Sequence, residues 1–217
     1  MNNLINLKLT QDQLDMLKEL GNIGSGHAIT ALSELLNNKI EVSLTTADIM
    51  PFWKVPELFD NPNMEMVGIY SDIPSKTDLA IIQIFTKESI INLINILTNH
   101  DKISSKDLKI IDDLDDFSCS IINEIGNILS GHYANAIADL LSIKLMPNVP
   151  KIAFDSLTAI LEGVIAKYSQ ISDYMVIINT KLTVSDIKLE GTICLIPSIS
   201  ILKSLFDILN VKYELNL

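Results

Sequence analysis

The sequence predicts an α+β fold in which a largely antiparallel sheet, flanked by helices, is built from two pseudo-symmetric halves. Three observations lead to this prediction. A 22-residue segment near the N-terminus recurs 105 residues later with 11 identical positions. Each copy is followed by alternating or continuous apolar runs that have the length of a strand. The connections between these runs are short, which favours antiparallel pairing over the long crossovers of a parallel sheet.

The repeat is strongest between residues 18–39 and residues 123–144. The identical pairs are Glu19/Glu124, Gly21/Gly126, Asn22/Asn127, Ile23/Ile128, Ser25/Ser130, Gly26/Gly131, His27/His132, Ala31/Ala136, Leu35/Leu140, Leu36/Leu141 and Lys39/Lys144. A weaker similarity relates residues 79–97 to residues 191–209 at an offset of 112, so a few residues are inserted in loops. Two copies are too few for a solenoid of stacked repeats.

We therefore expect a single domain, residues 1–217, made of two repeats at about 8–100 and 106–212 that share one sheet. A chain of 217 residues is long enough to bury a core without disulfide staples. Its two cysteines, Cys119 and Cys194, form no CxxC pattern, and we interpret them as small buried hydrophobic residues.

In the first copy, apolar residues at helical spacing are followed by an alternating run that is typical of a strand. Two prolines, Pro51 and Pro56, interrupt the next stretch, and a turn at Pro74 separates two further apolar runs. The expected elements are a helix at 11–37, strands at 40–46, 64–73 and 78–86, and a helix at 87–99.

The second copy repeats this order and adds one short helix. The expected elements are a helix at 106–142, a strand at 144–154, a short helix at 156–168, strands at 174–184 and 188–197, and a helix at 199–210. The segment 101–116 joins the copies and carries four aspartates between residues 112 and 116. We interpret these acids as a solvated helical face or turn rather than as a metal site.

The charge balance excludes several classes of function. The chain has 27 acidic residues against 16 basic ones, all of them lysine, and a net charge of −11. A nucleic-acid-binding protein needs a basic stripe to meet phosphates, and the sequence offers none. No apolar run approaches the ~18–20 residues of a membrane span, and the N-terminus does not resemble a signal peptide. We expect a cytoplasmic protein.

The repeated helix presents a polar face in both copies. At about 100° per residue, its polar positions fall within a sector of about 60°, and its apolar positions fall on the opposite side. The polar positions are Asp15, Glu19, Asn22 and Gly26 in the first copy and Ser120, Glu124, Asn127 and Gly131 in the second. The apolar positions are Leu17, Leu20, Gly24, Ala31 and Leu35 in the first copy and Ile122, Ile125, Leu129, Ala136 and Leu140 in the second.

A solvated surface is the simplest interpretation of such a face, but several features oppose it. Asparagine is a mediocre residue in a helix interior, and each glycine there costs about 1 kcal/mol. Both copies nevertheless keep Glu, Gly, Asn and Gly at identical spacing. Ile23 and Ile29 flank the first polar face, where a docking partner could cover them. We therefore favour a recognition or catalytic face.

An exposed carboxylate and an amide one turn apart have a limited chemistry. The amide can hold a water molecule by one hydrogen bond, and the carboxylate can pair with a lysine. Neither is a nucleophile, and the sequence shows no partner base. The pair suits the positioning of a water against an electrophile that another protein supplies, which is a known role of an amide side chain in phosphoryl transfer.

The two faces carry a pattern that resembles a known family. The Asp/Ser-x-x-x-Glu-x-x-Asn signature of the CheC/CheX/FliY chemotaxis phosphatases is matched twice, by Asp15-x-x-x-Glu19-x-x-Asn22 and by Ser120-x-x-x-Glu124-x-x-Asn127. The residues within and around the two motifs are most similar to CheC-type members. That family pattern also has a proline 23 residues after the Asn. Pro150 satisfies it in the second copy, whereas the first copy has Thr45 there. The resemblance covers nearly the whole chain.

The resemblance implies hydrolysis of the aspartyl phosphate of the response regulator CheY. It implies that Asn22 and Asn127 orient the attacking water and that Glu19 and Glu124 engage the lysine beside the phosphate. It implies no cofactor of the chain's own, since the regulator supplies Mg²⁺. It also implies binding of the receptor deamidase CheD. We place the remaining polar positions, Asp15, Ser120, Gly26 and Gly131, in the binding surface.

Some alternatives stay open. The chain could be a non-catalytic adaptor that binds the regulator or CheD, or a relative of the flagellar-switch proteins, although a protein that only binds has less need of Glu and Asn in register. We interpret His27 and His132 as helix-packing residues rather than bases. We expect Asn127 to mark the stronger site, because Pro150 completes its pattern. An internal pseudo-dimer has less need of a second chain, so we expect a monomer.

Overall fold

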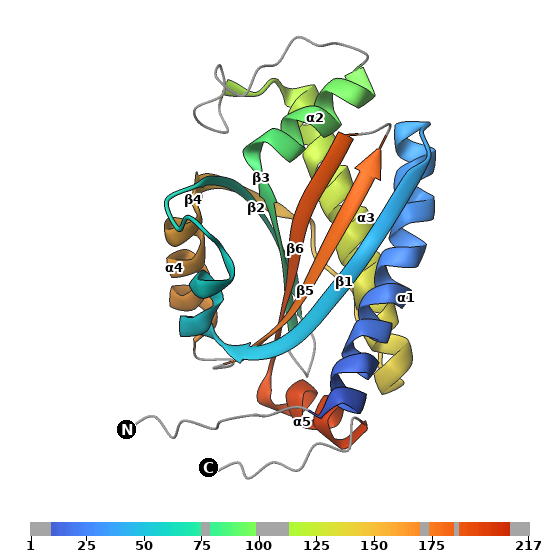
Figure 1. Ribbon diagram of the computed structural model, residues 1–217, viewed down its shortest axis with the longest axis vertical. Helices are drawn as coiled ribbons and strands as arrows, with labels where there is room; N and C mark the ends of the chain where they lie inside the picture. Colours follow the sequence, from blue (N-terminus) through green and yellow to red (C-terminus); the bar gives the residue numbers. More distant parts are fainter. Residues whose placement is uncertain (1–9, 75–78, 99–112, 170–173, 185–186, 209–217) are drawn as a thin grey trace.

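The computed structural model describes residues 10–74, 79–98, 113–169, 174–184 and 187–208 (Figure 1). The elements, in chain order, are α1 (Gln11–Leu36), β1 (Ile40–Pro51), the 3-10 helix η1 (Phe52–Leu58), β2 (Glu65–Ile73), β3 (Leu79–Thr86), α2 (Lys87–Thr98), α3 (Asp116–Leu141), β4 (Lys151–Ser156), α4 (Leu157–Tyr168), β5 (Tyr174–Val184), β6 (Ile187–Pro197) and α5 (Ile199–Ile208). The predicted α+β class is confirmed.

The six strands form one sheet in the order β1-β5-β6-β3-β2-β4, and every neighbouring pair is antiparallel. In the two copies, β1, β2 and β3 correspond to β4, β5 and β6. When each strand is exchanged for its counterpart, the order of the sheet reads the same from the opposite end. The pseudo-two-fold axis passes between β3 and β6, where Ile82 pairs with Cys194. The first strand of each copy lies in the other copy's half of the sheet, because β1 pairs with β5 and β4 pairs with β2.

The helices cover the two faces of the sheet unequally (Figure 1). The long helices α1 and α3 lie side by side on one face, and their apolar sides pack with the sheet into two hydrophobic clusters. The helices α2 and α5 extend these clusters at opposite ends of the pair. A third cluster joins the other face of the sheet to α4 and η1. The central strand β3 is buried on both faces, which explains its continuous apolar run.

Each long helix has a well-defined start and end. Thr10 caps α1 through a capping box with Gln13, and Asp115 caps α3 by accepting a hydrogen bond of 2.7 Å from the backbone N–H of Ser118. Both helices end at a residue in the left-handed conformation, Asn37 in α1 and Ser142 in α3. The equivalent ends support the two-fold relation between the helices.

The sequence-based boundaries are wrong at two places in the second copy. The helix expected from residue 106 begins at Asp116, because the Asp115 side chain caps it there; residues 106–112 lie outside the described residues. The strand expected at 144–154 is β4, Lys151–Ser156, and the preceding segment is irregular. Pro147 and Pro150 have no N–H to donate to a neighbouring strand, which explains the late start. In the first copy, β1 is five residues longer than expected and ends at Pro51.

Compensating residue sizes let α1 and α3 pack closely. The ring of Tyr133 lies against Gly24, where an added Cβ would come within 2.8 Å of it. The repeat relates Gly24 to Leu129 and Tyr133 to Ala28, so each large residue on α3 corresponds to a small one on α1. Gly24 on α1 thus makes room for Tyr133 on α3. At the equivalent positions of the other copy, the small residue is Ala28 and the large one is Leu129, and both are buried.

Candidate functional site

The predicted polar faces are exposed in the structure. Asp15, Glu19, Asn22 and Gly26 are exposed on α1; Ser120, Glu124 and Asn127 are exposed on α3, and Gly131 is half-buried. The opposite side of each helix is largely buried, as the helical spacing predicts. The exceptions are Ala31 and Leu35, which are half-buried, and Leu140, which is 36% exposed near the end of α3. Leu140 is therefore not the core residue that the periodicity indicated.

The carboxylate and amide of each face are available to a partner. Among the residues that the structure describes, the side chains of Glu19, Asn22, Glu124 and Asn127 form no hydrogen bond or ion pair. A long polar side chain without an internal contact loses no interaction when it turns toward a partner. Each helix therefore presents a Glu–Asn pair whose donors and acceptors are free for intermolecular bonds.

The first position of each pattern behaves differently. The Asp15 carboxylate accepts hydrogen bonds from Lys18 at 2.8 Å and from Gln11 at 2.9 Å. These two hydrogen bonds lower the pKa of Asp15, and the bond from Lys18 has the larger effect. The Ser120 hydroxyl donates to the backbone carbonyl of Asp116 at 2.8 Å. Both side chains are thus occupied within their own helix, which suits a role in shaping the surface rather than in chemistry.

The glycines of the repeat fall into two groups. A Cβ added at Gly26 or Gly131 would meet nothing within 4 Å, so internal packing does not require a glycine there. A Cβ added at Gly126 would come within 2.6 Å of Ile69 and 3.2 Å of Pro150. The first group leaves open space beside the Glu–Asn pair, which a partner's backbone could enter. Gly126 instead lets α3 sit close to the sheet and to Pro150.

The two Glu–Asn pairs lie at different levels along the helix pair. Gly24, against which Tyr133 of α3 packs, lies about 180° from Asp15 of the polar face at 100° per residue, and His27 lies about 120° from it. The helices run antiparallel, and the rings of His27 and His132 meet with centroids 6.0 Å apart. Asn22 and Asn127 each precede their histidine by five residues, so they lie roughly 15 Å apart along the helix axes at a rise of 1.5 Å per residue.

The histidines pack against each other at the pseudo-two-fold axis. Their rings meet edge to face, with an interplanar angle of 72°. Desolvation, with the repulsion of His27, lowers the pKa of His132. This contact fits the interpretation of both histidines as helix-packing residues.

Sequence reasoning missed a buried polar network beneath α3. The Gln83 amide on β3 donates to the backbone carbonyl of Gly126 at 3.0 Å and to the Ser130 hydroxyl at 2.7 Å. The Ser130 hydroxyl donates in turn to that of Ser71 on β2 at 2.7 Å. The signal was available, because Gln83 is the one polar residue in the apolar run from Leu79 to Phe85.

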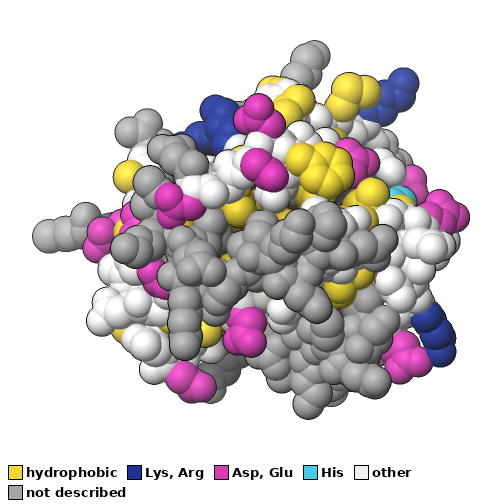
Figure 2. Space-filling view, turned by 90° about the horizontal axis from the view of Figure 1, so that it is seen from above, with side chains coloured by type: hydrophobic (Ala, Val, Ile, Leu, Met, Phe, Trp, Pro, Cys, Tyr) yellow, Lys and Arg dark blue, Asp and Glu magenta, His cyan; other side chains and the backbone are white. Residues whose placement is uncertain are grey.

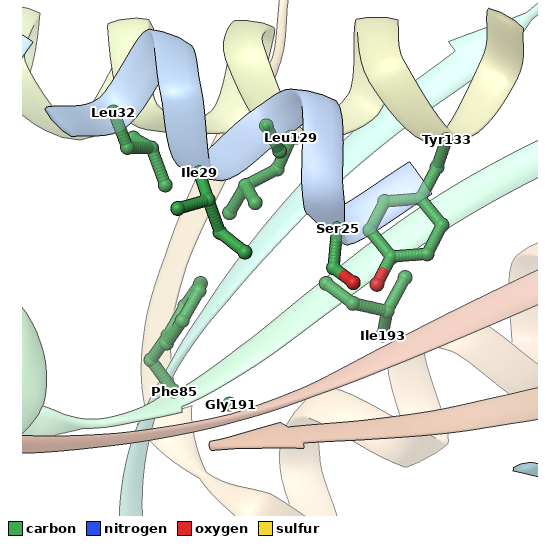
Figure 3. Close-up of a pocket in the computed structure, with 9 residues that line it drawn as sticks. Ser25, Ile29, Leu32, Phe85, Leu129, Tyr133, Gly191 and Ile193 are labelled. Atoms are coloured by element: carbon green, nitrogen blue, oxygen red, sulfur yellow. The ribbon is translucent and has the colours of Figure 1, made fainter. Parts of the chain in front are cut away.

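A small hollow beneath the helix pair is not a substrate site. Its volume is about 10 Å³, room for about one water molecule. Figure 3 shows Ile29, Phe85 and Tyr133 around it, together with other side chains from both helices and the sheet. No group of three or more His, Cys, Asp or Glu side chains within the described ranges could hold a metal ion.

The described part of the face drawn in Figure 2 carries mostly acidic and uncharged side chains. Figure 2 shows lysines standing apart from one another on the end of the molecule that carries α2, with acidic side chains spread among hydrophobic ones. A nucleic acid would find no continuous basic stripe on the described part of this face. None of the helices in the described ranges is long and apolar enough to cross a membrane.

Comparison with known proteins finds relatives over both halves. The model of the CheC-like family matches residues 13–43 and 117–153, which include both polar faces and Pro150. The CheY-P phosphatase CheC of Bacillus subtilis (strain 168) is 30% identical over 181 residues, covering 80% of this chain and 81% of that protein. The flagellar motor switch phosphatase FliY of the same strain is 29% identical over 75 residues, which cover 35% of this chain and 20% of FliY.

A solved structure has the same fold. The crystal structure of Thermotoga maritima FliY matches with a TM-score of 0.70 and 18% sequence identity, over 94% of this chain and 99% of that one. At this identity the likeness concerns the arrangement of helices and strands only.

Proposed function

The chain belongs to the CheC-like family, and on this premise we propose that it is a phosphatase that hydrolyses the aspartyl phosphate of the chemotaxis response regulator CheY. The observation that carries the proposal is the exposed Glu–Asn pair on each long helix, with donors and acceptors free and open space at Gly26 and Gly131. The B. subtilis CheC relative, a CheY-P phosphatase by name, supports the same substrate.

In the proposed reaction, the regulator supplies the electrophilic phosphorus and this chain supplies the alignment. Asn22 or Asn127 enters the regulator's site, and its amide oxygen accepts a hydrogen bond from the attacking water. The water oxygen bonds to phosphorus and the bond from phosphorus to the aspartyl oxygen breaks. The products are inorganic phosphate and the free carboxylate of the regulator. Positioning of this kind converts an encounter into a near-unimolecular step.

The glutamate of each pair has a docking role in this proposal. Glu19 or Glu124, one turn from the asparagine, pairs with the lysine beside the regulator's phosphate and fixes the orientation of the two proteins. The chain has no arginine, so it offers no arginine finger for the transferred phosphoryl group. The Mg²⁺ belongs to the regulator's site in this proposal. Catalysis by this chain thus reduces to water alignment and docking.

The test follows phosphate release from phosphorylated CheY. We expect the wild-type protein to accelerate release, the variants Asn22→Ala and Asn127→Ala each to lose part of the acceleration, and the double variant to lose it all. The double variant should still bind phosphorylated CheY, because both glutamates and the surrounding faces remain. An adaptor would bind the regulator yet leave its dephosphorylation unchanged in all four proteins, and that result would refute the proposal. Binding of CheD stays a prediction that a pull-down with purified CheD can check.

A further inference from the structure

The polar network beneath α3 acts at the turn that carries the second Glu–Asn pair. Gly126, which accepts the hydrogen bond from Gln83, directly precedes Asn127. The same glycine lies against Ile69 and Pro150 so closely that no side chain fits there. The backbone of this turn is therefore held from beneath by a hydrogen bond from β3 and from the side by close packing.

Among the residues that the structure describes, the first half of the molecule shows no such anchor. The Ser25 hydroxyl, which corresponds to that of Ser130, donates at 2.7 Å to the carbonyl of Gly21 in its own helix. The offset of 112 relates Gln83 to Leu195, and the strand registers relate Ser71 to Ile178. Both of these counterparts are apolar and buried. At the turn that carries its Glu–Asn pair, α3 is thus tied to the sheet by hydrogen bonds, whereas the equivalent positions beneath α1 are apolar.

Stability alone does not account for the network. Among the described residues, the Oε1 atom of Gln83 is buried without a hydrogen-bond partner, which is an unfavourable state for an amide oxygen. The other half shows that this fold tolerates leucine at the equivalent position. A buried polar group that a hydrophobic residue could replace, and that contacts the backbone beside a functional side chain, fits a positioning role.

We propose that Gln83 is a positioning residue, which holds the α3 turn so that Asn127 keeps the position that water alignment requires. This inference rests on the proposed phosphatase function. Gln83 acts on the backbone of the second site only, because the equivalent residue beneath α1 is Leu195, whose side chain cannot donate a hydrogen bond. Water alignment depends on the position of this backbone, since a displacement of about 1 Å in a catalytic group can lower a rate about a hundredfold.

The test places Gln83→Leu in two backgrounds, each of which leaves one site intact. In Asn22→Ala protein, which retains the second site, we expect Gln83→Leu to lower kcat about tenfold, with KM little changed because the docking surface stays in place. In Asn127→Ala protein, which retains the first site, the same change should leave both constants as they were. Gln83→Met, which is closer in volume to glutamine and donates no hydrogen bond, should behave as Gln83→Leu does.

Thermal unfolding separates positioning from a general structural role. We expect Gln83→Leu to leave Tm unchanged or higher, because Ser130 can turn to the Gly126 carbonyl as Ser25 does with Gly21. Equal losses of kcat in both backgrounds, or a loss accompanied by a fall in Tm, would overturn the inference. An unchanged kcat in Asn22→Ala protein would overturn it too, as would the absence of any second-site activity. A wild-type protein without activity would instead refute the proposed function itself.

Discussion

Two glycines five residues apart on α3 allow a matched test of the packing. The variants Gly126→Ala and Gly131→Ala add the same methyl group to the same helix. A Cβ at Gly126 comes within 2.6 Å of Ile69 and 3.2 Å of Pro150, whereas a Cβ at Gly131 meets nothing within 4 Å. Both variants gain the same helix propensity, about 1 kcal/mol. Their difference in stability therefore isolates the contacts with Ile69 and Pro150.

The magnitude follows from these contacts. Gly131→Ala should raise the free energy of unfolding by about 1 kcal/mol. Overpacking at Gly126 costs about 1–3 kcal/mol, which cancels the propensity gain or exceeds it by up to about 2 kcal/mol. The variants should thus differ by about 1–3 kcal/mol, and each kcal/mol corresponds to about 2–4 °C in Tm for a chain of this size.

Urea unfolding monitored by circular dichroism, with thermal melts alongside, measures this difference. Gly131→Ala should also raise KM for phosphorylated CheY while stabilising the fold, because its methyl group fills the space beside Asn127 that a partner would enter. Equal stabilities of Gly126→Ala and Gly131→Ala would refute the close seating of α3 on Ile69 and Pro150. A more stable Gly131→Ala protein with unchanged KM would refute the role of that space in docking.

Two further predictions concern the seam between the long helices. Tyr133→Ala removes a fully buried ring and should lower the free energy of unfolding by about 3–5 kcal/mol, measured by urea denaturation; a loss below 1 kcal/mol, a value typical of surface positions, would contradict the packing. The pKa of His132 in the folded protein lies below the ordinary histidine value of 6.5 because of desolvation and the nearby His27. The unfolded chain therefore binds more protons below that pH, and stability should fall as the pH drops from about 6.5 through the folded-state pKa. His132→Gln should flatten this dependence of Tm on pH, and an unchanged slope would show that another group causes it.

Much of the fold could be predicted because its signals are local. The periodic apolar residues of α1 and the buried run of β3 indicate their structure within a short window, and the boundaries of β5 were predicted without error. The same reasoning placed both polar faces, since the direction of a side chain on a helix depends only on its position.

The errors arose where a contact distant in sequence or a single capping residue decides the structure. Asp115 starts α3 ten residues later than the periodicity indicated, because the periodicity contains no information about which of several aspartates caps the helix. Leu140 keeps the spacing of a core residue, yet it lies one residue before the end of α3 and is 36% exposed. The contact of Gln83 with Gly126 joins residues 43 positions apart, so sequence alone offered only an unusual glutamine among apolar neighbours.

The exchange of first strands between the halves of the sheet has a consequence for any fragment of the protein. A fragment with only the first repeat would have no β5 for β1 to pair with, and the outer edge of β2 would lack β4. Exposed strand edges of this kind recruit other strands. Two such fragments could satisfy one another by lending each other their first strands, as in a swapped dimer. The intact chain therefore resembles a swapped dimer whose two halves are covalently joined, and neither half can be removed without exposing strand edges in the other.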